Sequence, residues 1–188
     1  HVLDTAVALG AVPPRFAAVG PPGSLECYFA MARGASVEGV AVPPLELTKW
    51  FDTNYHQLVP EIGPDTVFAL DPAKALGELE EARSLGIETT PVLLGPFTFL
   101  LRSASTAPGR SPLSLLDRLG ALYCDFLAEL ASRDVGWVRL DEPALVEDRR
   151  PEELDALRDL SRRIGETPSR PRLVISTYFG HVGEAMTV

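Results

Sequence analysis

Two neighbouring carboxylates are the first side chains in this sequence that could do chemistry. Asp141 and Glu142 directly follow the strand-like run that begins at Trp137. A carboxylate pair can act as general acid and base, bind a metal ion or hold a polar ring. Neighbouring side chains of a strand point to opposite faces, so only one of the two can face a given ligand. We expect the second carboxylate to accept a hydrogen bond from a backbone amide or to pair with a cation such as Arg139 or Arg102. The alternative is that both carboxylates are structural acceptors and neither contacts a ligand.

A lysine beside two aromatic residues is the second candidate. Lys49 precedes Trp50 and Phe51 and is one of only two lysines, the other being Lys74 on a predicted helix surface. The remaining cationic side chains are arginines. A compact ammonium group at this place could act as a point charge for a carboxylate or phosphate ligand. The alternative is an exposed, solvated lysine.

Metal binding and nucleophilic catalysis have little support. Zinc needs three or four converging ligands, and His56, His181, Cys27 and Cys124 show no such spacing. Cys124 lies on the apolar stripe of a predicted helix, where packing is the expected role. The serines of segment 103–111 have no histidine in a motif context. We therefore expect no catalytic residue, no metal ion and no cofactor in this chain.

The elements that would position these residues alternate between strands and helices. Apolar spacing and N-terminal signals predict four helices, beginning near Ser24, Asp71–Pro72, Ser111–Pro112 and Pro151. Strand-like runs are predicted at 50–55, 90–94, 137–140 and 173–177. The runs within 91–94 and 173–175 are continuously apolar, as in strands covered on both faces. This order predicts an α/β fold with a parallel sheet.

The same pattern favours a (β/α) barrel of the TIM type over a doubly wound sheet. No Gly-rich phosphate loop follows any predicted strand. Polar side chains gather after every strand instead, as a barrel site requires: Asp52, Asn54 and His56; Thr98; Asp141 and Glu142; Thr177 and Tyr178. A complete barrel takes about 250 residues, so four strands predict only a partial barrel, and we see no domain boundary inside the chain.

Composition excludes several classes of protein. The 188 residues carry a net charge of −9, which disfavours nucleic acid as a partner. No apolar run is long enough to span a membrane, and two cysteines make no disulfide framework; we expect a cytoplasmic protein. The chain opens on His1 rather than Met, which indicates a trimmed start or an internal piece of a longer protein.

Five segments together resemble the cobalamin-independent methionine synthases, and the resemblance runs in order over essentially the whole chain. They read MARG (31–34), LTKWFDTNYHQLVPE (47–61), LLGPFTFLLR (93–102), WVRLDEPALV (137–146) and STYFG (176–180). The opening HVLDTAVALGAVP fits the same family. The threonine-lysine-tryptophan and TYFG segments mark the chain as the N-terminal barrel of this two-barrel family, incomplete over residues 1–188.

The resemblance implies a function. Family members transfer a methyl group from 5-methyltetrahydropteroyltriglutamate, a folate polyglutamate, to homocysteine, whose thiol is activated by zinc. The lysine matching Lys49 contacts the folate tail, and Asp141 matches a pterin-binding aspartate by analogy with the other barrel. The zinc ligands and the homocysteine pocket belong to the C-terminal barrel, which is absent here. The family's Arg-Glu-x-Lys stretch would precede His1, and His181 departs from the family pattern.

We therefore expect part of a methyltransferase of methionine biosynthesis, contributing tail binding and scaffold and inactive by itself. Its partners would be the folate, homocysteine and the C-terminal barrel. Two alternatives stay open. One is a non-catalytic binding or scaffold module of barrel origin. The other is a barrel hydrolase that uses Asp141 or Glu142 with Asp52 as the second carboxylate.

Overall fold

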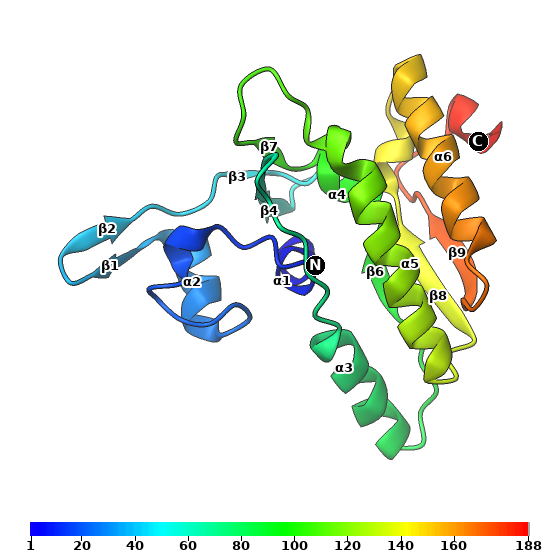
Figure 1. The fold of residues 1–188 in the computed structure, drawn as a ribbon, viewed down its shortest axis with the longest axis horizontal. Coiled ribbons are helices and arrows are strands. Elements are labelled where there is room, and N and C mark those ends of the chain that lie inside the picture. The colour runs from blue at the N-terminus through cyan, green and yellow to red at the C-terminus, as the bar shows by residue number, and fades with distance from the viewer. Residues whose placement is uncertain (188) are drawn as a thin grey trace. The chain divides into compact units, whose positions relative to one another are not determined.

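The computed structural model describes residues 1–187, and the chain divides into two compact units (Figure 1). Unit 1 comprises His1–Asp71 and Arg102–Pro112, and unit 2 comprises Pro72–Leu101 and the chain from Leu113 onward. Each unit has its own buried residues and its own sheets, so each is described by itself.

Unit 1 consists of short helices and three two-stranded sheets. β1 pairs with β2 and β3 with β4, both antiparallel, whereas β5 and β7 are parallel. The elements are α1 (Val2–Ala8), the 3-10 helix η1 (Pro14–Phe16), α2 (Leu25–Arg33), β1 (Ala35–Val37), β2 (Val40–Val42), β3 (Leu47–Lys49), β4 (His56–Leu58), β5 (Glu61–Ile62) and β7 (Ala104–Ser105).

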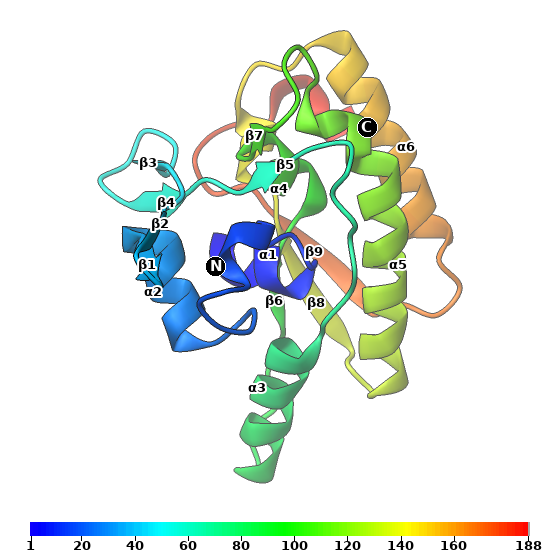
Figure 2. The same cartoon turned by 60° about the vertical axis from the view of Figure 1, so that its left-hand side comes forward.

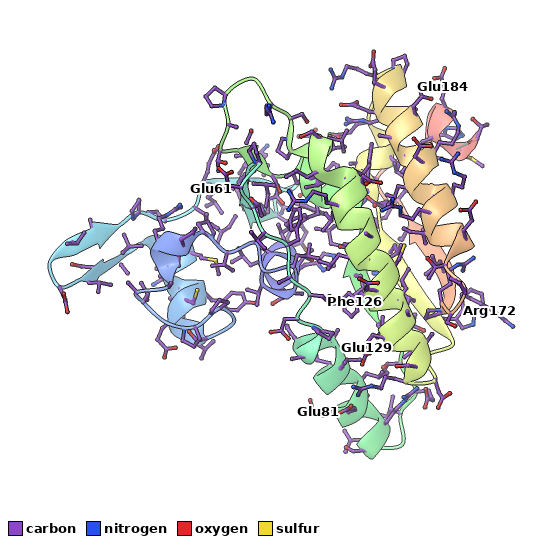
Figure 3. The ribbon with its side chains drawn as sticks, in the orientation of Figure 1. Glu61, Glu81, Phe126, Glu129, Arg172 and Glu184 are labelled. Atoms are coloured by element: carbon purple, nitrogen blue, oxygen red, sulfur yellow. The ribbon has the colours of Figure 1, made fainter. Side chains whose placement is uncertain are left out.

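The core of unit 1 forms around α2. The helix begins where the Ser24 hydroxyl accepts the amide of Cys27 at 3.2 Å, so the helix start predicted near Ser24 is confirmed. Its inward face packs with η1 and β2 in one cluster: Phe16, Cys27, Ala30, Met31, Val42 and Leu45. Glu61, labelled in Figure 3, binds the guanidinium of Arg15 (Nη2 to Oε1, 2.8 Å) and so ties η1 to β5.

Unit 2 contains a parallel three-stranded sheet in the order β6–β8–β9. α5 and α6 lie side by side in both views and belong to the connections that lead from β6 to β8 and from β8 to β9 (Figures 1 and 2). The elements are α3 (Ala73–Ser84), β6 (Val92–Leu94), α4 (Pro96–Leu101), η2 (Pro112–Leu115, whose first residue belongs to unit 1), α5 (Leu116–Ser132), β8 (Trp137–Asp141), η3 (Pro143–Val146), α6 (Pro151–Glu166), β9 (Arg172–Ser176) and η4 (Gly183–Thr187).

Packing between α5 and α6 follows the predicted apolar stripes. The stripe of α5 is buried at Leu119, Tyr123, Phe126, Leu127 and Leu130, as the three-to-four spacing predicts. A Cβ atom at Gly120 would lie 2.8 Å from Leu160 Cδ1 of α6. The missing side chain therefore lets the two helices approach closely.

The expected alternation is confirmed in unit 2, where three of the four predicted strands form one parallel sheet. The fourth prediction is wrong, because segment 50–55 is the turn between the antiparallel strands β3 and β4. The described residues form no closed barrel. The prediction of strands covered on both faces is also wrong for β9, one of the two edge strands of this sheet, where Val174 and Ile175 are 44% and 51% exposed.

Candidate functional site

Lys49 stands at the end of β3, immediately before the turn that links it to β4. In the ladder it pairs with His56. The Trp50 amide donates to the Tyr55 carbonyl at 2.8 Å, and the Thr53 hydroxyl donates to the Trp50 carbonyl at 2.6 Å and accepts the Tyr55 amide at 3.1 Å. Threonine side chains that bond nearby backbone compete with strand pairing. This explains why an aromatic, strand-like segment forms a turn.

The ammonium group of Lys49 is open to solvent. Its side chain is 62% exposed and lies 4.0 Å from the carboxylate of Asp52, which is fully exposed. An exposed pair at this distance is held weakly. Lys49 is therefore available to an anionic ligand, while its role as a contact for such a ligand stays a prediction.

Sequence reasoning assigned no role to the contact between Phe51 and Arg102. The Arg102 guanidinium carbon lies 4.1 Å from the centroid of the Phe51 ring, and the Trp50 ring meets Phe51 edge-on at 4.9 Å. Phe51 adopts φ = 54°, which is rare for a bulky side chain. No sequence signal links the two residues, because they are far apart in the chain.

In unit 2 the strand ends that precede the predicted polar residues lie next to one another. The Gly95 amide donates to the Asp141 carbonyl and the Glu142 amide donates to the Ser176 carbonyl, both at 2.8 Å. The ends of β6, β8 and β9 are thus joined side by side. The polar residues that follow these strands therefore start from neighbouring strand ends, and their gathering into one site stays a prediction.

Glu142 binds the first turn of α4. Its carboxylate accepts the amides of Phe97 and Thr98 at 3.1 and 2.7 Å, while Thr98 Oγ1 accepts the amide of Ala144 at 3.2 Å. A Cβ atom at Gly95 would collide with the carboxylate. Burial raises the pKa of Glu142 to about 7, although the hydrogen bonds from Thr98 and Phe97 act to lower it. Glu142 is a buried acceptor that fastens α4 to the end of β8.

Asp141 pairs with Arg139 of the same strand. The Arg139 Nε and Nη2 atoms donate to its carboxylate at 2.8 and 3.4 Å, and the Asp141 side chain is only 6% exposed. Both carboxylates therefore have partners inside the protein: Asp141 pairs with Arg139 and Glu142 accepts backbone amides. These are the two roles expected for the carboxylate that does not face a ligand, and a ligand contact by either one stays a prediction. Neither interaction tests whether Asp141 also contacts a ligand.

The remaining histidine beyond the strand ends has a local role. The Nδ1 atom of His181 accepts the amide of Gly183 at 2.9 Å. Within residues 1–187, no three or more histidine, cysteine or acidic side chains are grouped so that they could hold a metal ion. The residues described here do not fit a zinc site, so no zinc chemistry is derived from them. No described helix is both long and apolar enough to cross a membrane.

Comparison with known proteins places these features in a family. The model of the family described as cobalamin-independent synthase, N-terminal domain, matches residues 1–188. Three relatives are named 5-methyltetrahydropteroyltriglutamate–homocysteine methyltransferase. The protein from Streptomyces griseus is 53% identical over 100% of this chain, that from Rhodococcus jostii 50% over 99%, and that from Mycobacterium leprae 45% over 99%.

The chain spans 24% of the length of each of these relatives. The family model and the alignments to these relatives both cover essentially the whole chain. The chain therefore belongs to the cobalamin-independent methionine synthases, in their N-terminal domain.

Proposed function

We propose that this chain supplies scaffold and folate-tail binding to a methyltransferase that forms methionine from homocysteine and 5-methyltetrahydropteroyltriglutamate. The names of the relatives support these substrates for the whole enzyme. The reaction needs a methyl donor held in line with a thiolate. Zinc would lower the pKa of that thiol, and its ligands would come from a second barrel outside the 188 residues.

One observation carries the assignment of tail binding to Lys49. Its ammonium group is exposed at the end of a strand, next to a turn closed by three hydrogen bonds. The tail of a triglutamate carries several carboxylates, and a lysine binds such groups as a point charge. A cation that projects from an ordered turn can bind one of them without much further ordering.

The parallel sheet supports the barrel. β6, β8 and β9 with the helices between them form two successive β/α units, which are the repeating parts of a TIM barrel. We propose that they belong to a barrel completed by further strands, and that the enzyme works in the cytoplasm.

Asp141 is proposed as a separate contact, to the pterin. Its carboxylate already accepts two hydrogen bonds from the Arg139 guanidinium. A pterin would have to replace one of these hydrogen bonds. We expect Asp141→Asn to weaken binding of mono- and triglutamate folates by equal factors, because the pterin is common to both ligands. An effect confined to the triglutamate would contradict this assignment.

The test of Lys49 uses the protein expressed from its complete reading frame. In Lys49→Met we expect the Kd for methyltetrahydropteroyltriglutamate, measured by calorimetry, to rise about tenfold, which corresponds to about 1.4 kcal/mol. The Kd for the monoglutamate should stay unchanged. The matched control is Lys74→Met, since Lys74 lies on α3 and pairs with Glu78. Equal Kd values for the triglutamate in Lys49→Met and wild type would overturn the proposal.

A further inference from the structure

The turn that follows Lys49 holds a backbone conformation that its sequence does not favour. Phe51 has φ = 54°, a backbone region in which a bulky side chain is strained. Such a conformation persists only where surrounding contacts fix it. Around Phe51 these contacts are the edge-on ring of Trp50, the hydrogen bonds of Thr53 and the guanidinium of Arg102.

Arg102 is the member of this group that comes from outside the hairpin. It directly follows α4 in the sequence, two residues before β7, and belongs, like the hairpin, to unit 1. Its guanidinium carbon is 4.1 Å from the ring centroid, well inside the roughly 6 Å limit for a cation–π interaction. The contact therefore holds the turn against a part of unit 1 that is distant in sequence.

We propose that Arg102 is a positioning residue for tail binding: its stack on Phe51 fixes the strained turn and thereby fixes the place of Lys49. This inference rests on the proposed function, since it assumes that Lys49 binds the folate tail. Loss of the stack lets the turn relax, and Lys49 then samples more positions. Binding of the tail has to order it again, which costs affinity.

A positioning role differs in kind from direct contact with the tail. A guanidinium plane can stack on an aromatic ring, whereas an ammonium group is a compact charge that cannot present such a plane. Arg102→Lys would keep the positive charge and lose the planar stack. If Arg102 works through Phe51, substitutions at the two positions must also fail to add, because each removes the same contact.

The experiment compares Arg102→Met, Arg102→Lys, Phe51→Ala and the double variant Arg102→Met/Phe51→Ala in the complete protein. We expect a three- to tenfold rise in the triglutamate Kd for all four, with the double variant no worse than the worse single one. The monoglutamate Kd and the kcat at saturating triglutamate should stay at wild-type values, which shows that the variants fold. Arg33→Met is the matched control, because Arg33 lies 5.6 Å from the Phe29 ring on α2.

The outcomes separate this inference from the proposed function. If Lys49→Met weakens triglutamate binding and Arg102→Met does not, the positioning role is wrong while tail binding by Lys49 stands. Wild-type affinity in Arg102→Lys would show that the planar guanidinium is not needed, and additive losses in the double variant would show that Arg102 and Phe51 act independently. Either result would overturn the positioning role. If Lys49→Met has no effect, tail binding by Lys49 fails first, and the inference fails with it.

Discussion

Glu142 is an ionisable group whose burial opposes its charge. Its pKa is raised from 4.5 to about 7, chiefly by burial. The folded state therefore binds a proton more tightly than the unfolded chain does, so the contribution of Glu142 to stability is complete below pH 4.5 and is lost as the pH rises through 7. A change from 4.5 to about 7 corresponds to roughly 3 kcal/mol.

We expect this loss to be visible as a difference between wild type and Glu142→Gln. The free energy of unfolding, measured by urea denaturation from pH 4 to 8, should fall with pH more steeply in the wild type. The variant cannot titrate at this position, so the difference between the two curves isolates Glu142 from the other carboxylates. Parallel curves over this pH range would show that Glu142 is not the titrating group.

Asp52 provides a residue-scale test of electrostatics at the Lys49 turn. Its exposed carboxylate lies 4.0 Å from the Lys49 ammonium and would repel an anionic tail that binds there. We expect Asp52→Asn to lower the triglutamate Kd two- to threefold at low salt, with the gain shrinking as salt screens the charges. A weaker affinity would mean that Asp52 helps to hold Lys49 in place.

At the scale of elements, the junction of β6 and α4 depends on a glycine. The Glu142 carboxylate occupies the space where a Cβ atom at Gly95 would lie. We expect Gly95→Ala to lower the free energy of unfolding by about 2 to 3 kcal/mol, since overpacking forces buried groups to move. The control is Gly77→Ala in α3, because a Cβ atom at Gly77 would meet nothing within 4 Å. This substitution should stabilise the helix by up to about 1 kcal/mol. Thermal or urea unfolding measures both, and equal stability of the two variants would contradict the close contact between Gly95 and Glu142.

The elements predicted best are those with a long apolar period. The helices α5 and α6 follow directly from such spacing, and the strands β8 and β9 follow from short strand-like runs, whereas the turn at 50–55 does not follow from its sequence. There, aromatic residues favour a strand, but hydrogen bonds from Thr53 to the backbone close a turn. The start of α3 differs as well: Pro72 rather than Asp71 occupies its N-cap. The short α4 was missed because its cap comes from Glu142, which is remote in sequence.

At the scale of the whole molecule, the separated chain should not catalyse the reaction of its relatives. The described residues contain no group of three or more side chains suited to a metal ion, and thiol activation needs one under the proposed mechanism. We expect no methionine from the 188-residue chain supplied with zinc, homocysteine and the methylated triglutamate, measured by mass spectrometry. The protein from the complete reading frame is the positive control. Methionine formation by the 188-residue chain alone would refute the proposal that the zinc ligands lie in a second barrel.

Single residues of the candidate site could be identified from the sequence, but most of the side chains and backbone groups that they contact could not. Lys49 stood out because lysine is rare in this chain, and Asp141 because it directly follows a strand-like run. Arg139 was one of two cations expected to pair with one of the two carboxylates, and the structure pairs it with Asp141. Contacts between Arg102 and Phe51, or between Glu142 and α4, depend on how distant segments pack, and a single sequence carries no record of them.

The left-handed turn at Phe51 has a consequence for protein engineering. Glycine reaches φ = 54° at no steric cost, so a library selected only for thermal tolerance should enrich glycine at this position. The same exchange would remove the ring that Arg102 covers. Variants that gain thermal stability at this position would therefore discriminate less between long and short glutamate tails. A single side chain would then link the stability of the protein to its selectivity for tail length.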